Sequence, residues 1–472
     1  MLDFSKFDGR YEFFSFFEEI SKIPRGSGNT KKIADYLELF AKERGLFCYR
    51  DSSDNVVIKK SGTVGFEGTA PVILQGHTDM VIATEPDIPH DITKDGVDIY
   101  IDGDFLKARG STLGADNGVA VAYMLALLDS RDIPHPPIEA VFTSDEEIGL
   151  IGAAALDASV LSGKAMINLD SDEEGIFIAG CAGGLRTDIT LSYESVQADE
   201  HLEIIISGLR GGHSGGEINK GRVNAIRLLG EIIPDGIPFG EIKGGTADNA
   251  IADFCSFKAY PSDKLLENIE NALKKHSAAE PGLKIECAQK NCGASLISAE
   301  DSVKLLTLLR DLPCGVVAMN RSMPHLVETS MNFGIIETRD NAVTLSVSMR
   351  SSDNDEKAKL KERVVRISEN CGAKTISYGD YPGWKYREES KLRDTFSLYY
   401  EKLFGKTAKT VTIHAGLECG IFSDKIEDLD CISLGPLAYD IHTPKERLSI
   451  SSAIRVYKLL CEVLSNYKGE NK

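Results

Sequence analysis

The sequence lacks the features that would indicate a membrane protein or a nucleic-acid-binding protein. No window approaches about 18 uncharged apolar residues, so we expect no membrane-spanning helix. Basic residues are scarce, with 53 Lys and Arg against 72 Asp and Glu and a net charge of −19. Because nucleic acids and anionic membranes bind to basic surfaces, we expect neither as a partner.

The sequence also shows no sign of an oxidising compartment. Its ten cysteines include no CxxC pair, so we expect neither a disulfide framework nor a cysteine zinc site. The first residues, MLDFSKFDGRYEFF, contain neither a basic n-region nor an apolar h-region, and no secretory signal is expected. Reduced thiols and the missing signal favour a soluble protein of the cytoplasm.

The chain is long enough for two domains, at 472 residues. Helical periodicity over 29–45 and 117–129 alternates with apolar strand patterns over 71–76, 138–144 and 165–171, which predicts an α/β sheet with helices on both faces. From about residue 186 the patterns predict hairpin strands and amphipathic helices, typical of an inserted α+β domain. We therefore expect a catalytic domain formed by 1–185 and 384–472, with a second domain inserted at 186–383.

Acidic residues and a histidine occur directly after the predicted strands and at a helix start. They are His77 and Asp79, Asp116, Glu146 and Glu147, and Asp170. Each alone has an ordinary explanation as a turn residue, a helix cap or a solvated helix start. Ligands of an α/β sheet collect at the carboxyl ends of its strands, however, so all of them together predict a metal site.

The residue types at this edge suit a pair of metal ions. Imidazole and carboxylate ligate zinc, and also manganese or cobalt. Two ions about 3.5–4 Å apart need a carboxylate that can reach one ion with each oxygen. Asp79 lies two residues after His77 and suits the role of orienting that ring. Of the adjacent Glu146 and Glu147, one can bind metal while the other acts as a base.

Several segments resemble a known family. The motifs GHTDMV, LGADNGVAVA, TSDEEIGLIGA, NLDSDEEG and IHTPKERL are similar to those of the co-catalytic zinc peptidases that include aminoacylases, carboxypeptidases and carnosinases. The segments GCAGGL, GGHSGGEIN, ADNAIA, SMRSS and IHAGLECGIF resemble one branch, the bacterial aminoacyl-histidine dipeptidases. The resemblance covers essentially the whole chain. It implies an α/β catalytic domain, whose mixed sheet is flanked by helices, and an inserted α+β lid domain.

The resemblance also implies a role for each residue at the metal site. Asp116 would bridge two zinc ions per subunit, with manganese or cobalt as possible substitutes. His77 and Asp170 would complete one site, and Glu147 and His442 the other. Glu146 would be the general base and Asp79 the partner of His77, while the peptide bond after Asp116 would be cis.

The lid would contribute His213, Asn249 and Arg350, and the segment 414–420 would contribute Gly416 and Glu418. His213 would polarise the scissile carbonyl and stabilise the oxyanion, with Asn249 assisting. Arg350 and backbone amides around Gly416 would hold the carboxylate end of the substrate. Glu418 would meet the free amino group. The role of His414 stays open, and five further histidines are expected on the surface: His90, His135, His201, His276 and His325.

The resulting hypothesis is a dipeptidase in which a hydroxide bridging two zinc ions attacks the peptide carbonyl, with Glu146 as the base. Dipeptides of the Xaa-His type, including β-alanyl-histidine, are the expected substrates, and a homodimer is the expected assembly. The alternatives are a related metal-dependent amidase acting on N-acyl amino acids, or a tripeptidase. A metal-bound binding protein that has lost catalysis is more remote, since no expected ligand is missing.

Overall fold

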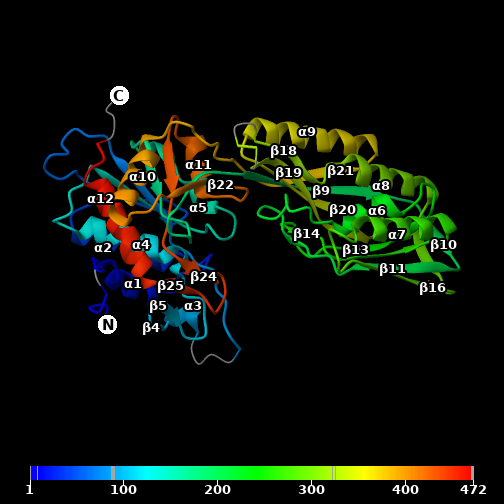
Figure 1. The fold of residues 1–472 in the computed structure, drawn as a ribbon, viewed down its shortest axis with the longest axis horizontal. Coiled ribbons are helices and arrows are strands. Elements are labelled where there is room, and N and C mark those ends of the chain that lie inside the picture. The colour runs from blue at the N-terminus through cyan, green and yellow to red at the C-terminus, as the bar shows by residue number, and fades with distance from the viewer. Residues whose placement is uncertain (1, 8, 87–90, 321–322, 325, 469–472) are drawn as a thin grey trace. The chain divides into compact units, whose positions relative to one another are not determined.

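The computed structural model describes residues 2–7, 9–86, 91–320, 323–324 and 326–468. They form two compact units (Figure 1). The first comprises 1–180, 386–412 and 417–472, and the second comprises 181–385 and 413–416. Both ends of the chain thus belong to the first unit. The predicted domain boundaries, after residues 185 and 383, remain a prediction.

An eight-stranded mixed sheet forms the centre of the first unit. Its order is β1-β2-β6-β3-β7-β23-β8-β22. The strands are β1 (Phe47–Arg50), β2 (Val56–Lys60), β3 (Val72–His77), β6 (Ile138–Thr143), β7 (Ala165–Asn168), β8 (Ile176–Cys181), β22 (Lys409–Ile413) and β23 (Asp430–Ser433). Strands β6, β3, β7 and β23 run parallel. Parallel strands are covered on both faces, which is why β3 and β6 are mostly apolar and all of their residues are buried.

Helices cover this sheet. The longer ones are α1 (Phe13–Ser21), α2 (Lys31–Glu43), α4 (Ala115–Asp129), α10 (Lys391–Phe404) and α12 (Ile450–Leu464), and the short ones are α3 (Ile92–Asp95), α5 (Ile151–Ala155), α11 (Glu418–Lys425) and the 3₁₀ turn η1 (Ala158–Val160). Helix α4 packs on β3 and on α1, and the rings of Phe13, Tyr123 and Tyr457 contact one another in the core. The predicted α/β architecture, a mixed sheet flanked by helices, is confirmed.

A smaller sheet completes the first unit. Its four strands are, in spatial order, β24 (Ala438–Tyr439), β25 (Arg447–Ser449), β5 (Phe105–Ala108) and β4 (Ile99–Asp102). The connection from β24 to β25 contains His442, whose φ of +63° is in the left-handed region. The loop therefore turns sharply where a predicted metal ligand occurs.

The second unit is an antiparallel sheet with helices packed on it. The sheet has the order β16-β11-β15-β13-β19-β20-β9-β21, with β18 also paired to β19. Its strands are β9 (Gly183–Ser192), β11 (His201–Ser207), β13 (Phe239–Gly244), β15 (Cys255–Ala259), β16 (Lys284–Lys290), β18 (Gly315–Met319), β19 (Val327–Arg339), β20 (Ala342–Ser351) and β21 (Lys374–Tyr381). Strands β19 and β20 form a hairpin whose two turn residues, Asp340 and Asn341, have φ values of +51° and +55°. Asp and Asn adopt this left-handed conformation more readily than most residues.

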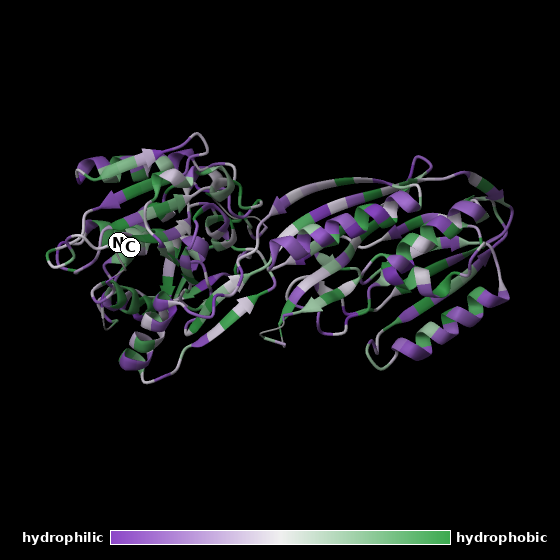
Figure 2. Ribbon diagram, turned by 90° about the horizontal axis from the view of Figure 1, so that it is seen from above, coloured by the Kyte–Doolittle hydropathy of each residue, from purple (hydrophilic) through white to green (hydrophobic). Residues whose placement is uncertain are grey.

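Four helices and two short ribbons accompany that sheet. The helices are α6 (Ala225–Ile232), α7 (Asp263–His276), α8 (Ala299–Asp311) and α9 (Asn354–Asn370), and the ribbons pair β10 (Ser195–Ala198) with β17 (Ala294–Ile297) and β12 (Gly212–His213) with β14 (Ala250–Ile251). Figure 2 shows both hydrophilic and hydrophobic residues along the visible helices of this unit, as expected for helices with one buried face.

Two of the histidines expected on the surface are buried instead. The side chains of His135 and His201 are 0% exposed, and their Nδ1 atoms lie 2.7 and 3.1 Å from the carbonyl oxygens of Pro136 and Cys292. That prediction was wrong because polar neighbours in sequence do not determine what packs over a side chain. His276 is partly buried beside Glu231. His90 and His325 lie outside the described residues.

No helix in the described part of the chain is both long and apolar enough to span a bilayer.

Candidate metal centre

The predicted metal ligands of the first unit meet at the carboxyl ends of its parallel strands. His77 is the last residue of β3, and Asp170 follows β7 by two residues. Glu146 and Glu147 follow β6, and His442 comes from the loop between β24 and β25. Asp116 lies at the start of α4, directly after a turn at Gly114 with φ +68°, and its peptide bond to Asn117 is cis.

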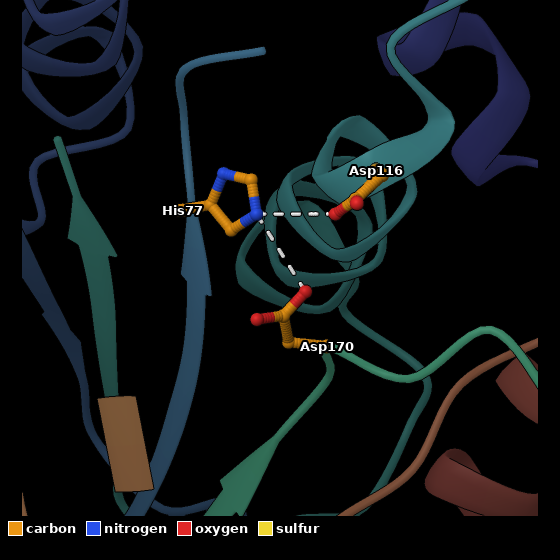
Figure 3. Close-up of side chains that lie close together, drawn as sticks. All are labelled: His77, Asp116 and Asp170. Carbon is orange, nitrogen blue, oxygen red and sulfur yellow. Dashed lines mark hydrogen bonds and ion pairs between the residues drawn. The ribbon is translucent and has the colours of Figure 1, made fainter. Parts of the chain in front are cut away.

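Asp116 lies between two histidines. Its Oδ1 is 3.1 Å from Nε2 of His77, and its Oδ2 is 3.1 Å from Nε2 of His442. The same nitrogen of His77 is 3.6 Å from Oδ1 of Asp170, and both contacts of this ring are drawn in Figure 3. Nε2 of His442 is 3.0 Å from Oε1 of Glu147. Two clusters of candidate ligands, His77/Asp116/Asp170 and Asp116/Glu147/His442, therefore share one carboxylate.

The electrostatics of this cluster favour bound cations. Hydrogen bonds that the His442 ring donates to the carboxylates of Asp116 and Glu147 raise its pKa to about 10. Burial alone would lower the pKa of His77, but the carboxylates of Asp170 and Asp116 raise it. Burial and the charge of Asp170 raise the pKa of Glu146 well above its ordinary range. The site concentrates more negative charge than its two imidazoles can offset, and its nitrogen and oxygen donors fit a pair of divalent ions such as zinc.

Asp79 connects the His77 ring to the loop that follows β6. It is fully buried, and its backbone oxygen and its Oδ1 lie 3.1 and 3.4 Å from Nδ1 of His77. Both partners are acceptors, so a neutral ring with its proton on Nδ1 would be held in place and would offer the lone pair of Nε2 to a metal. The carboxylate of Asp79 also accepts hydrogen bonds from Ser27 Oγ at 2.8 Å and from the backbone N–H of Glu146 at 3.0 Å.

The predicted lid residues belong to the second unit. His213 pairs with Ala250 across the β12–β14 ribbon, and the backbone oxygen of Asn249 accepts from Ser214 N–H at 2.8 Å. Arg350 and Asn249 both line a cavity of about 20 Å³. Nη1 of Arg350 donates to the Tyr381 hydroxyl at 3.2 Å, while its buried Nε has no hydrogen-bond partner among the described residues.

Gly416 packs closely against the same tyrosine. A Cβ at this position would lie 2.8 Å from a carbon of the Tyr381 ring, so a larger residue would displace that ring. The structure thus gathers Asn249 and Arg350 around one cavity and packs Gly416 on the Tyr381 ring that lines it. Eight other predicted residues, Glu418 among them, belong to the first unit.

Comparison with known proteins identifies the family. Residues 73–466 match the profile of Peptidase family M20/M25/M40. Over 466 residues the chain is 36% identical to the cytosol non-specific dipeptidase of Escherichia coli K12, covering 95% of this chain and 96% of that protein. The chain belongs to peptidase family M20/M25/M40. It is a metallopeptidase.

Solved structures of other proteins share its fold. The crystal structure of aminoacylhistidine dipeptidase from Vibrio alginolyticus matches with a TM-score of 0.92 and 32% identity, over 99% of both chains. A tripeptidase from Staphylococcus aureus matches with a TM-score of 0.59 and 18% identity, over 96% of this chain and 97% of that one. The latter similarity concerns the fold alone.

Sequence reasoning missed two residues that hold the Asp116 turn of this M20 peptidase. The carboxylate of Glu446, 3% exposed, accepts hydrogen bonds of 2.8–3.3 Å from four successive backbone N–H groups, those of Leu113, Gly114, Ala115 and Asp116. Buried Arg25 donates to the carbonyl oxygens of Thr78 and Gly114. Glu446 stands in the motif IHTPKERL, four residues after His442, but nothing in the motif indicates its partners. No local signal marked Arg25.

The surroundings of His213 determine which of its nitrogens carries the proton. The backbone N–H groups of Gly215 and Gly216 both donate to its Nδ1, each at 3.2 Å. A neutral ring with Nδ1 as acceptor carries its proton on Nε2. Burial and the charge of Arg350 lower the pKa of His213, which favours this neutral form. The ring therefore presents an N–H donor through Nε2.

His414, left open by the sequence, is held inside the second unit. Its Nε2 lies 2.7 Å from Oγ of Ser330. Burial and the charge of Arg350 lower the pKa of its ring to about 3, so the imidazole is neutral at physiological pH. Only the tertiary structure brings Ser330 to this ring.

Proposed function

We propose that this metallopeptidase hydrolyses dipeptides with two divalent metal ions bound at the Asp116 cluster, zinc being the expected metal and manganese or cobalt possible substitutes. The observation that carries the proposal is the position of Asp116, whose two oxygens face two different histidines at 3.1 Å each. His77 and Asp170 would complete one site, and Glu147 and His442 the other.

The substrate class is supported by the relatives. Proteins named as a non-specific dipeptidase and as an aminoacylhistidine dipeptidase match this chain over nearly its whole length. We propose Xaa-His dipeptides, including β-alanyl-histidine, among the substrates of this protein, and a location in the cytosol like that of the Escherichia coli relative.

Glu146 is the proposed general base. When two zinc ions are bound, they supply Lewis acidity and a water of lowered pKa. Glu146 would take the proton of the attacking water and pass it to the leaving amine. Its backbone N–H donates to Asp79, which fixes the loop that carries it, and burial raises the pKa of its carboxyl.

His213 and Asn249 are the proposed oxyanion donors. The neutral His213 ring would donate its Nε2–H to the carbonyl oxygen as negative charge develops there, and a fixed donor of this kind contributes most in the transition state. Its tautomer is supported by the two glycine amides at Nδ1.

Arg350 is the proposed anchor for the carboxylate end of the substrate, together with the backbone around Gly416. The buried and unpartnered Nε of Arg350 supports this role, because a buried donor without an acceptor is unfavourable and a carboxylate would satisfy it. An anchor at a set distance from the metals would limit good substrates to dipeptides.

The experiment that tests the function compares three substrates with and without metal. Hydrolysis of β-alanyl-histidine, alanyl-histidine and an N-acetyl amino acid is measured before chelation, after chelation and after zinc is added back. We expect only the dipeptides to be cleaved, and only with metal. Cleavage of the N-acetyl compound would move the protein to the amidases, and no cleavage with zinc bound would favour a binding protein.

We also propose a homodimer, as the family resemblance implies. The monomer has a mass of 51.4 kDa, so light scattering after size exclusion should report about twice that value. A mass near that of one chain would overturn the assignment.

A further inference from the structure

Glu418 is a buried carboxylate that forms no ion pair with any residue the structure describes. It is the first residue of α11 and is 0% exposed. Its Oε2 accepts hydrogen bonds from Oγ1 of Thr143, at 2.8 Å, and from Nε2 of Gln75. Its Oε1 is buried with no hydrogen-bond partner among the described residues. A carboxylate buried in this way is unfavourable unless a positive charge lies nearby.

The partners of Glu418 form a polar layer across three neighbouring strands. Oε1 of Gln75, on β3, accepts from Nδ2 of Asn168, on β7, at 2.6 Å. Thr143 is the last residue of β6, and its hydroxyl lies 3.1 Å from Nε2 of Gln75. The side chains of all three residues are buried. Glu418 thus connects β6, β3 and β7 through one hydrogen-bond network.

In each of these three segments, the residue of the polar layer comes two or three positions before a residue of the metal centre. Gln75 precedes His77 by two residues, Asn168 precedes Asp170 by two, and Thr143 precedes Glu146 by three. In the parallel register Thr143 is the neighbour of His77. Because residues two apart on a strand face the same side, Gln75 supports the side from which His77 projects.

Electrostatics indicate that Glu418 and the metal centre affect one another. Burial and the charge of Asp170 raise the pKa of Glu418 to about 7. Three carboxylate ligands leave two divalent ions with a net positive charge, and that charge would favour the ionised form of Glu418.

A direct contact between Glu418 and substrate does not fit this geometry. A carboxylate that binds the amino group of a substrate must be reachable from solvent, whereas Glu418 is 0% exposed and one of its oxygens already accepts two hydrogen bonds.

We propose that Glu418 is a positioning residue of the metal centre. Its buried negative charge stabilises the bound cations. Its carboxylate also holds the side chains of Gln75 and Thr143, which precede His77 and Glu146 in the chain. The inference rests on the proposed two-ion function. It replaces the role in amino-group binding that the sequence suggested.

The test is the zinc affinity of the metal-free protein, measured by competition with a chromophoric chelator. Glu418→Gln keeps the size of the side chain and one acceptor oxygen but removes the charge. We expect zinc to bind about 10–100-fold more weakly, the range found when groups behind metal ligands are altered. Far-ultraviolet circular dichroism should be unchanged, and kcat should fall more than KM rises.

Glu139→Gln is the matched control. Glu139 lies on β6, the strand that ends at Thr143, and is buried as Glu418 is. It accepts hydrogen bonds from the N–H of Gly163 and from Lys59 instead. Its substitution should leave zinc affinity unchanged. If Glu418→Gln does not fold, Thr143→Val removes one hydrogen bond to the carboxylate at nearly equal volume and should weaken zinc binding in the same direction.

Two results would overturn the inference. One is a zinc affinity in Glu418→Gln equal to that of the wild type or of Glu139→Gln. The other is an unchanged zinc affinity with a raised KM confined to substrates that have a free amino group, which would restore the substrate contact. Failure of the proposed function is a separate result, because a wild type that cleaves no dipeptide still permits the comparison of zinc affinities.

Discussion

Replacing Glu446 by Gln tests how the turn that presents Asp116 is held. The carboxylate oxygens of Glu446 accept four backbone N–H groups, from Leu113 to Asp116. A glutamine retains one acceptor oxygen and turns an NH₂ group toward the other two N–H groups. Hydrogen bonds to a charged group contribute about 1.5–3 kcal/mol each, so losing two destabilises the turn by about 3–6 kcal/mol. This approaches the whole stability of many proteins, about 5–15 kcal/mol, so we expect the turn to rearrange.

Rearrangement of the turn would displace Asp116 and weaken the metal site. We expect Glu446→Gln to lower the thermal midpoint of the metal-free protein and to reduce zinc affinity at least about tenfold. Chelator competition and calorimetry measure the two effects. The control is Glu280→Gln in the second unit, where a buried glutamate accepts from the backbone N–H groups of Arg210 and Val223 at 3.0 and 3.2 Å. This variant should lose stability without losing zinc affinity.

The reasoning would be refuted by a Glu446→Gln protein with the midpoint and zinc affinity of the wild type. It would also be refuted if both variants lost the same zinc affinity, since the effect would then be a general consequence of destabilisation and not of the turn.

Three further predictions concern catalysis and pH. Glu146→Gln should retain zinc and lose about 10²–10⁴-fold in kcat, and near-normal turnover would remove Glu146 from its role as base. If Arg350 anchors the substrate carboxylate, the C-terminal amide of a dipeptide should be cleaved much more slowly than the dipeptide, and comparable rates would disprove the anchor. His414 has a folded pKa of about 3 against about 6.5 when unfolded, so below pH 6.5 the unfolded chain binds a proton that the folded protein does not. The free energy of unfolding is therefore unaffected by this group above pH 6.5 and falls by about 1.4 kcal/mol per pH unit as pH falls toward 3. The thermal midpoint of His414→Gln should therefore depend less on pH between 6 and 4 than that of the wild type, and equal slopes would contradict this.

Much of the first unit follows from local sequence patterns. The apolar runs at 71–76, 138–144 and 165–171 form β3, β6 and β7, and the parallel order predicted for buried strands is present. The polar residues after these runs come together because the ends of parallel strands share one edge of the sheet. His77, Asp170 and Asp116 could therefore be selected from the sequence, since their positions depend on short-range geometry and one common sheet rule.

Only the tertiary structure determined what holds these residues in place. Glu446 reaches a turn more than 300 residues earlier in the chain, and Glu418 accepts from Gln75 across 343 residues. The burial of Glu418, His135 and His201 likewise depends on segments remote in sequence. Periodicity and motifs describe a residue and its near neighbours along the chain, whereas burial and hydrogen-bond partners depend on which distant segments pack together. The sequence alone therefore indicated the chemistry of the candidate metal centre, and the fold determined its supporting contacts.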